Sequence, residues 1–368
     1  MIRSCAQACV GSVTNRPDSK FVVFCHEAGR GTGHLGKMAF EDLKDVLRCI
    51  RTSRDVLVPP LPGFDCGVHR LGKDRCVVVA TDPCINVPIE HFGWLLFHYS
   101  ASDVSVFGAS PQFCTINLLG PPGTRSRVFR DVMRQVCMAA EELRTIIIAG
   151  HTGVYDGIEV LLGVCTAYGV LRKKDLITPA GARPGDLILC TKPLGLEVLT
   201  NLAIRRKRLA TKLFGAERTH YLAKCIRMQS CVREAHILAR SGAVSAMHDV
   251  TEGGLVAALG ELANASNVGF TLEYGNLPLL PELERLADHF GLSGDQLLSM
   301  SSTGTLLAAI SSGHEGRILK KLTANRINAQ VVGAFTKAKQ RIIKHNGRAT
   351  SFPESFDDPY AEIIGADS

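Results

Sequence analysis

Residues 245–262 read Ser-Ala-Met-His-Asp-Val-Thr-Glu-Gly-Gly-Leu-Val-Ala-Ala-Leu-Gly-Glu-Leu, and this stretch decides the fold. Its first half predicts the end of a strand, and its second half has apolar residues at helical spacing, so we expect a helix to begin close to Asp249. Gly253 and Gly254 would each weaken the first turn by roughly 1 kcal/mol relative to alanine. This cost indicates that a ligand or another backbone approaches closely. The alternative is a capping box, in which Asp249 and Glu252 satisfy the free amide groups without a ligand.

The composition is that of a globular protein. The chain has 368 residues, of which 46% are hydrophobic, and is long enough for two domains of ordinary size. Its formal net charge is +7, but the basic residues are dispersed except at 205–208 and 337–344, where no aromatic residues are interleaved. We therefore expect no nucleic-acid partner and a modest preference for anionic ligands.

The cysteines and the apolar runs indicate the compartment. The thirteen cysteines are scattered, and none forms a Cys-x-x-Cys pair, so we expect neither a structural metal nor a disulfide framework. No apolar run approaches 20 residues, and the first 20 residues do not resemble a signal peptide. We expect a cytoplasmic protein without a membrane partner.

Three carboxylates in the first half stand where ligands are commonly held. Asp65 lies in a loop rich in proline and glycine at 60–68, and Asp82 follows Thr81 at the end of an apolar strand. Asp103 follows Ser102 on a mostly apolar helix predicted over 90–108, where an ionised carboxylate is costly unless it is paired or binds metal. The alternative for Asp65 and Asp82 is an ordinary turn.

Two glycine-containing segments complete the candidates. A strand predicted over 145–149 leads into Gly150-His151-Thr152. The histidine is either a loop residue whose hydrogen bonds are made within the protein or a contact to a phosphate. Residues 29–37 end in Gly-Lys at the spacing of a phosphate loop. However, Met38 stands where the magnesium-binding hydroxyl is required, which argues against such a loop.

Four short motifs occur in order along the chain, at 102–111, 150–152, 247–255 and 301–307. Together they resemble the aminoimidazole ribonucleotide (AIR) synthetase, or PurM-like, superfamily, which also contains selenophosphate synthetase, thiamine-phosphate kinase and the carbamoyl dehydratase of hydrogenase maturation. Residues 247–255 are most similar to the hydrogenase-maturation branch. Two departures are that His151 replaces an acidic residue and that no cysteine follows Cys231, so we expect no thiocarbamate route through a C-terminal cysteine tail.

The resemblance implies an α+β fold with two domains. Its first domain would be a mixed sheet with helices, its second an α/β sandwich, and the protein would dimerise through the first sheet. We accordingly place an N-terminal extension at 1–35, an ATP-binding domain at 36–174, a second domain at 175–345 and a tail at 346–368.

The resemblance also implies ATP and Mg²⁺ as cofactors. The metal ligands would be Asp65, Asp82 and Asp103. Contacts to the nucleotide would come from Lys37, Thr81, Ser102, Gly150, His151, Thr152, Asp249, Glu252, Gly253 and Gly254. Members of this superfamily activate an oxygen of their substrate by phosphorylation or ATP cleavage, so we expect an ATP-dependent enzyme with an unidentified substrate. Two alternatives remain, a small-molecule kinase like thiamine-phosphate kinase and a non-catalytic maturation scaffold that binds nucleotide.

Overall fold

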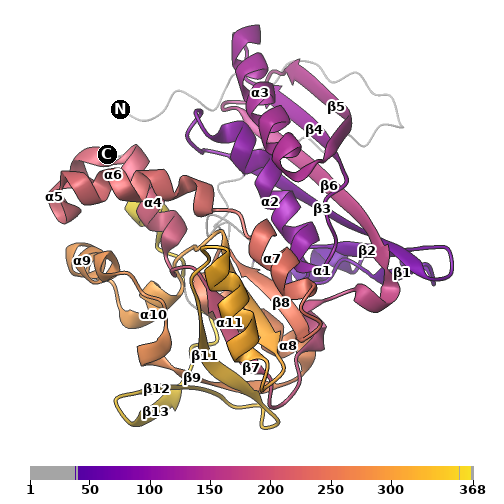
Figure 1. Cartoon of the computed structure of the whole chain (residues 1–368). Helices are drawn as coiled ribbons and strands as arrows, with labels where there is room; N and C mark the ends of the chain where they lie inside the picture. The colour runs from indigo at the N-terminus through magenta and orange to yellow at the C-terminus, as the bar shows by residue number, and fades with distance from the viewer. Residues whose placement is uncertain (1–37, 39, 356, 366–368) are drawn as a thin grey trace, which may run out of the picture. The chain divides into compact units, whose positions relative to one another are not determined.

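Two β-sheets and their covering helices make up the described part of the chain (Figure 1). The computed structural model describes residues 38, 40–355 and 357–365. Lys37, the extension at 1–35 and the glycine segment at 29–37 lie outside these residues. Among the described helices, none combines the length and the apolar character needed to cross a membrane.

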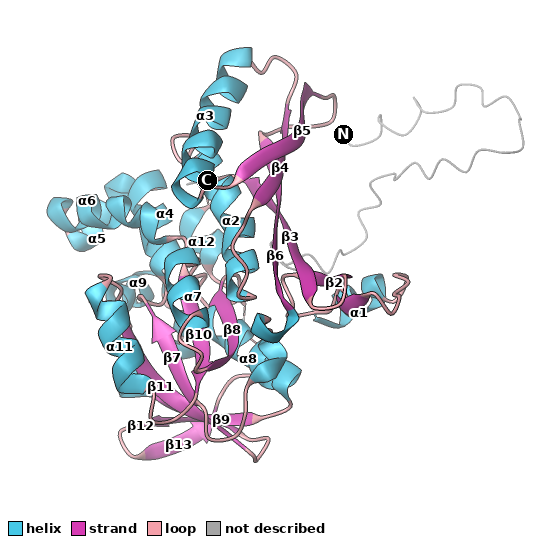
Figure 2. Cartoon of the chain, turned by 45° about the vertical axis from the view of Figure 1, so that its right-hand side comes forward, coloured by secondary structure: helices cyan, strands magenta, loops and turns pink. Residues whose placement is uncertain are grey.

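The first sheet has six strands in the order β1-β2-β3-β6-β4-β5, and all neighbours are antiparallel except β4 and β5. Helices α2 and α3 pack on one of its faces (Figure 2). The elements of this half are α1 (Phe40–Leu47), β1 (Val56–Val58), β2 (Gly67–Leu71), β3 (Arg75–Ile85), α2 (Phe92–Val106), β4 (Phe113–Gly120), α3 (Ser126–Leu143), β5 (Ile146–Val154) and β6 (Leu162–Arg172).

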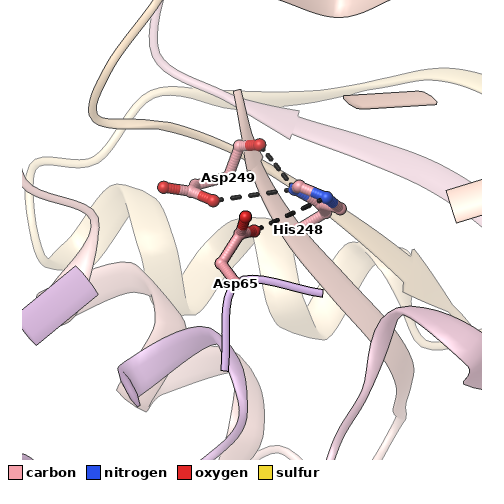
Figure 3. A group of neighbouring side chains, drawn as sticks. All are labelled: Asp65, His248 and Asp249. Carbon is pink, nitrogen blue, oxygen red and sulfur yellow. Dashed lines mark hydrogen bonds and ion pairs between the residues drawn. The ribbon is translucent and has the colours of Figure 1, made fainter. Parts of the chain in front are cut away.

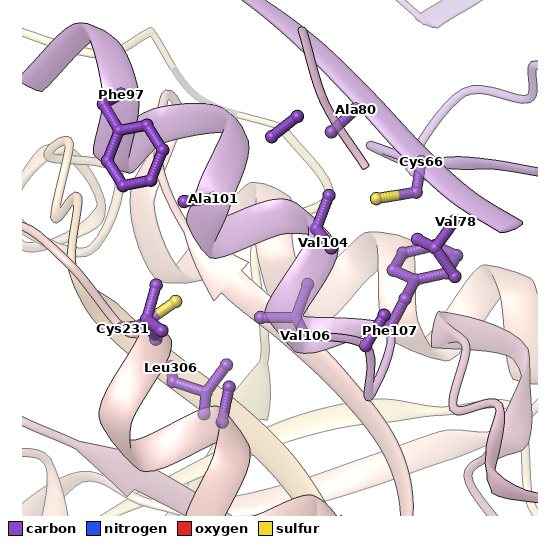
Figure 4. Close-up of a cluster of buried hydrophobic side chains, with 14 of the residues drawn as sticks. Cys66, Val78, Ala80, Phe97, Ala101, Val104, Val106, Phe107, Cys231 and Leu306 are labelled. Carbon is purple, nitrogen blue, oxygen red and sulfur yellow. The ribbon is translucent and has the colours of Figure 1, made fainter. Parts of the chain in front are cut away.

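Helix α2 is buried on nearly every side. Figure 4 shows Val104 beside the β3 residues Val78 and Ala80, while Cys231 and Leu306 of the second half lie across the helix from them. A helix that is apolar all round must be covered all round. The apolar sequence of α2 therefore requires contact with both sheets, and its polar side chains become buried with it.

The second sheet has seven strands in the order β13-β12-β9-β11-β7-β10-β8, antiparallel except for β9 with β12. Helix α8 packs on one face, and α7 and α11 pack on the other. The elements are β7 (Leu187–Thr191), α7 (Val232–Ala239), β8 (Val244–Val250), α8 (Gly254–Ser266), β9 (Gly269–Glu273), β10 (Thr305–Ile310), α11 (Glu315–Ala324), β11 (Ala329–Thr336), β12 (Arg341–His345) and β13 (Arg348–Ser351). Strand β13 extends this sheet beyond residue 345.

Further helices form a third apolar cluster beside the second sheet. They are α4 (Leu196–Arg205), α5 (Lys207–Phe214), α6 (Ala216–Lys224), α9 (Pro281–Phe290), α10 (Gly294–Leu298) and α12 (Tyr360–Ile364). Short 3₁₀ turns lie at Lys173–Asp175, Pro179–Gly181, Cys225–Met228 and Tyr274–Asn276. The α+β class, the mixed first sheet and the α/β sandwich predicted from the sequence are confirmed.

The helix predicted to begin near Asp249 begins later. Strand β8 continues to Val250, because Asp249 and Val250 pair with β10, and α8 starts at Gly254. The capping box is wrong, since the N-cap residue is Gly253 and no side chain of that turn caps the helix.

Gly254 allows a close approach of backbone. Its φ is +58°, and a Cβ atom there would lie 2.5 Å from the carbonyl oxygen of Met300 and 2.6 Å from that of Leu298. The residues at 298–300 therefore lie against the start of α8. The glycine serves backbone packing at this position.

We predict that Gly254→Ala destabilises the fold by at least about 2 kcal/mol, because it combines a left-handed φ with a backbone clash. Gly316→Ala is the matched control. Gly316 lies in α11 without positive φ, and nothing lies within 4 Å of its would-be Cβ. Its replacement should stabilise the protein by about 0.5–1 kcal/mol. Urea unfolding of both variants tests this, and equal midpoints would contradict it.

Candidate functional site

Asp65, His248 and Asp249 come together from distant parts of the chain (Figure 3). Asp65 lies in the loop between β1 and β2, whereas His248 and Asp249 end strand β8. The Nε2 atom of His248 lies 3.7 Å from Oδ2 of Asp65, and its Nδ1 lies 3.6 Å from Oδ1 of Asp249. One ligand atom from each residue lies within 4.8 Å of the others, a spacing at which one metal ion could contact all three, but a protonated His248 leaves the two carboxylates as the ligands.

His248 supplies a positive charge to this group. Its Nε2 atom lies 2.9 Å from Oε2 of Glu261 on α8, and its Nδ1 donates a hydrogen bond to the backbone carbonyl of Asp249 at 2.7 Å. Burial by itself lowers the pKa of His248, but the carboxylates of Asp65, Asp249 and Glu261 outweigh burial and hold it well above its ordinary value. The imidazolium therefore offsets part of the negative charge.

Asp82 and Asp103 extend the acidic group. Asp82 lies on β3, in the same inward-facing row as Val78 and Ala80, and Asp103 is buried on α2. Burial raises the pKa of Asp82 to about 6, even though a hydrogen bond with Asp103 favours its ionised form. Burial also raises the pKa of Asp103 well above its ordinary value, and the nearby charges of Asp82, Asp249 and Asp65 raise it further. Four carboxylates thus share one electrostatic environment, as the sequence predicts for Asp65, Asp82 and Asp103.

Two oxygens of this group are buried and have no hydrogen-bond donor. They are Oδ2 of Asp82 and Oδ1 of Asp249, and the second of these has only the ion pair with Nδ1 of His248 at 3.6 Å. Buried carboxylate oxygens without a donor are costly, and a hard divalent cation is the partner that such oxygens prefer. The donor set therefore fits Mg²⁺.

Cys66 lies next to Asp65 and is also buried. It belongs to the same apolar cluster as Val78 and Phe107, and its sulfur is directed towards helix α2 near Val104 (Figure 4). Burial raises the pKa of this thiol well above its ordinary value, and the surrounding aspartates raise it further. Because the thiolate is the reactive form, Cys66 acts as a core residue and not as a nucleophile.

Thr81 and Ser102 do not face the acidic group in the way the sequence predicts. Consecutive strand residues point to opposite faces, so Thr81 is exposed on the far side of the sheet from Asp82. Its hydroxyl makes a 2.9 Å hydrogen bond with that of Thr166. Ser102 is buried against α7, where its Oγ accepts a hydrogen bond from the backbone N–H of Cys231 at 3.3 Å.

Gly150, His151 and Thr152 lie within β5 instead of after it. Strands β4 and β6 separate β5 from β3, which puts it about 14 Å from the strand of Asp82. The three residues are exposed on an edge strand, and the ring of His151 makes a short hydrogen bond with the hydroxyl of Tyr155. The structure therefore does not bring this motif to the acids of the same chain.

The glycine turn before α8 holds a carboxylate that the sequence analysis missed. Oδ2 of Asp358 accepts hydrogen bonds from the N–H groups of Gly253 and Ser301, both at 3.1 Å. Glu252, in the same turn, is exposed. No sequence signal identified Asp358, because it stands in an irregular segment far along the chain. His248 and Glu261 were also missed, although His248 lies within the stretch that decides the fold.

Two family models match the chain. The model described as AIR synthase related protein, N-terminal domain, matches residues 63–171, and the corresponding C-terminal domain matches residues 183–346. The chain belongs to the AIR synthase related family. Asp65, Asp82 and Asp103 fall in the first of these family domains, and Asp249 falls in the second.

The chain is similar to individual known proteins at identities of 20–27%. A selenide, water dikinase of Myxococcus xanthus (strain DK1622) is 27% identical over 351 residues, covering 86% of this chain and 95% of the relative. The carbamoyl dehydratase HypE of Cupriavidus necator (strain ATCC 17699 / DSM 428 / KCTC 22496 / NCIMB 10442 / H16 / Stanier 337) is 27% identical over 280 residues, covering 73% and 75%. The crystal structure of hydrogenase maturation protein HypE in complex with ATP shares the fold, with a TM-score of 0.65 and 20% identity over 79% of this chain and 89% of HypE.

We predict that the contribution of the acidic group to the stability of the metal-free protein falls as the pH rises from about 5 to 8. Asp82, Asp103 and His248 all have raised pKa values in the folded state, so each favours folding while it is protonated and stops doing so as the pH passes its folded pKa. In Asp103→Asn this slope should be shallower, whereas in Asp131→Asn, which changes an exposed acid on α3, it should be unchanged. Urea midpoints measured across this pH range in EDTA provide the test, and parallel slopes for all three proteins would rule out the coupling.

Proposed function

We propose that this protein is a Mg²⁺- and ATP-dependent enzyme that activates an oxygen of its substrate by phosphorylation or related ATP cleavage. The observation that carries the proposal is the meeting of Asp65 and Asp82, which are partly buried, with the buried Asp103 and Asp249 in one group. Like charges this close repel one another unless cations are shared among them.

The charge balance supports a cation at this position. The carboxylates around His248 outweigh its burial and favour its charged form, and burial together with the neighbouring acids raises the pKa of Asp103 when no metal is bound. Asp65, Asp82 and Asp103 would hold Mg²⁺, with Asp249 beside them, and the donor-free oxygens of Asp82 and Asp249 supply acceptors. Mg²⁺ is usually held by a few carboxylates together with substrate phosphates, which leaves room for a nucleotide triphosphate.

The chemistry of ATP suits this kind of site. Phosphoryl transfer depends mainly on positioning and on neutralising charge, so it needs no nucleophilic triad from the protein. HypE has been crystallised with ATP, and another relative is named a dikinase. HypE and the dikinase are each 27% identical to this chain, so sequence identity does not assign the chain to either of their branches of the family. We place the chain in the ATP-using class and leave its substrate open.

We predict that Asp82→Asn and Asp103→Asn each weaken binding of Mg²⁺-ATP by about tenfold or more, because each removes a carboxylate from the proposed cation site. Isothermal calorimetry with a non-hydrolysable ATP analogue and Mg²⁺ measures the change. Asp131→Asn, an exposed acid on α3, is the control and should bind like the wild type. Unchanged affinity in both site variants, with normal folding by circular dichroism, would refute the proposed role.

Measuring where the γ-phosphate of ATP goes distinguishes the proposed enzyme from a small-molecule kinase and from a non-catalytic scaffold. Transfer to an added small molecule such as thiamine phosphate indicates a kinase. Release into water only when the natural substrate is present indicates the activating enzyme. Nucleotide binding without cleavage, under any substrate tried, indicates a scaffold.

We also propose a homodimer formed through the first sheet. Strand β5 is an edge strand, and Ile146, Ile148 and Val154 are about half exposed along it. The sheet face opposite α2 and α3 has no helix over it among the described elements. A long apolar edge of this kind invites pairing with another chain. In a dimer His151 would lie at the interface, where it could reach a nucleotide held by the partner.

Ile148→Asp should therefore shift the protein towards the monomer, because a charge at this edge opposes burial. Val46→Asp is the control, since Val46 is similarly exposed on α1, away from the sheet edge. Sedimentation velocity over a range of concentrations provides the measurement. A wild type that stays monomeric at all concentrations contradicts the dimer.

A further inference from the structure

The positive charge of the chain is concentrated in one segment. Residues 204–228 contain eight basic residues and one acidic residue, Glu217, so the formal net charge of this segment is +7. The basic residues are Arg205, Arg206, Lys207, Arg208, Lys212, Arg218, Lys224 and Arg227. Because the whole chain also has a net charge of +7, acids and bases are balanced over the rest of it.

Helices α4, α5 and α6 build this segment into one folded surface (Figure 1). They pack together through the third apolar cluster, to which α5 contributes the buried side chains of Ala210 and Phe214. The exposed basic residues of α4 and α5 are Arg205, Lys207, Arg208 and Lys212. We call these four residues the basic patch. Because the helices beneath it are anchored in an apolar core, the patch is held on ordered backbone.

The charges around the start of α5 are unfavourable for the fold itself. Arg206 is the N-cap residue of this helix, Lys207 and Arg208 lie in its first turn, and the first turn contains no acid. The positive end of the helix dipole lies at this terminus and disfavours cations there. Arg208 and Lys212 are four residues apart, a spacing at which like charges repel each other on a helix. An anion bound at the patch would relieve both effects.

Ion pairs do not neutralise the basic patch within the described part of the chain. There, no salt bridge or side-chain hydrogen bond reaches Lys207, Arg208 or Lys212. By contrast, Arg218 of the same segment is held by Glu282 through two hydrogen bonds, at 2.6 and 3.1 Å. The unpaired cations of the patch are therefore available to a partner.

A groove of about 460 Å³ runs beside the patch. Its walls carry the basic residues 205–208 together with the apolar residues Leu209 and Ile364. The guanidinium of Arg206 donates a hydrogen bond to the backbone carbonyl of Ile363 at 3.0 Å, which ties α12 to the start of α5. Cationic and apolar groups thus line the same groove. A segment in which carboxylates flank an apolar side chain would complement both.

An acidic protein segment fits this surface better than a nucleic acid does. Proteins that bind single-stranded nucleic acids combine cations with aromatic side chains on which the bases stack. The exposed aromatic residue of this segment is Tyr221, and the guanidinium of Arg218 lies over its ring, 4.5 Å from the centroid. Leu209 and Ile364 offer apolar contacts that a peptide side chain can use and a phosphate backbone cannot.

We propose that the basic patch docks an acidic segment of a partner protein. Carboxylates of the partner pair with Lys207, Arg208 and Lys212, and an apolar side chain between them enters the groove beside Leu209 and Ile364. Complementary charge of this kind steers association and is screened by salt. The proposal shares no residue with the acidic group and does not depend on the proposed function.

The test measures fluorescence anisotropy of a fluorescein-labelled peptide made of Glu-Glu-Leu repeats as the full-length protein is added. The double variant Arg208→Glu/Lys212→Glu should bind the peptide at least about tenfold more weakly than the wild type. This variant should fold, because it places an acid in the first turn of α5, where the helix dipole favours it. Arg127→Glu/Arg130→Glu makes the same change of charge at exposed positions of α3 and should bind like the wild type.

Three results would overturn the proposal. The first is a wild type without saturable binding of the peptide, and the second is equal affinity of the wild type and the patch variant. The third comes from a labelled oligothymidine of similar charge. If it binds more tightly than the peptide and loses its binding in the patch variant, the patch belongs to a nucleic acid. Saturable peptide binding that the patch variant loses, and that weakens as salt is added, supports the docking surface.

Removing residues 366–368 separates a partner from the end of the chain itself. A chain that stops after Gly365, which lines the groove, should bind the peptide like the full chain. If only the shortened chain binds the peptide, the patch serves the chain's own last residues and the proposal is wrong.

Discussion

The concentration of negative charge around His248 is the constraint on which the rest of the site depends. Asp65, Asp82, Asp103 and Asp249 come from four different positions in the chain, and bringing them together opposes folding unless protons or cations compensate. In the metal-free protein burial favours the neutral forms of Asp82 and Asp103, and the carboxylates around His248 outweigh its burial and favour its charged form. A divalent cation would provide the same compensation while leaving all four carboxylates ionised.

Helix α2 is what brings these groups within reach of one another. Because its surface is apolar all round, it packs against the first sheet on one side and against α7 and β8 on the other. Asp103 is carried into the interior between the two halves, next to the strand that presents Asp249. The hydrophobic packing of α2 and the electrostatics of the site are thus two consequences of one buried helix.

The sequence predicted that Asp65, Asp82 and Asp103 lie close together. For the glycine turn it predicted a close approach but not which group approaches. Asp103 was identified because a carboxylate on an apolar helix needs a partner, and that argument depends on local residues alone. Thr81, predicted as a nucleotide contact, lies away from the acids of its own chain because its neighbour Asp82 takes the inward face of the strand and alternation turns Thr81 outwards. Gly254 was correctly linked to a close approach, but the approaching group is the backbone of 298–300. Its identity depends on a contact between segments that are far apart in sequence.

The sequence by itself determined the two-domain α+β plan and the family, because apolar periodicity, glycine placement and motif order are properties of short stretches. The tertiary structure alone decided that β8 continues past Asp249, that His248 balances the acids and that Gly150-His151-Thr152 lies on an exposed edge. It also alone revealed that Asp358 accepts hydrogen bonds from the N–H groups of Gly253 and Ser301. The physical reason is that hydrogen bonds and charge coupling act through distance in space, whereas separation along the chain is nearly irrelevant to them.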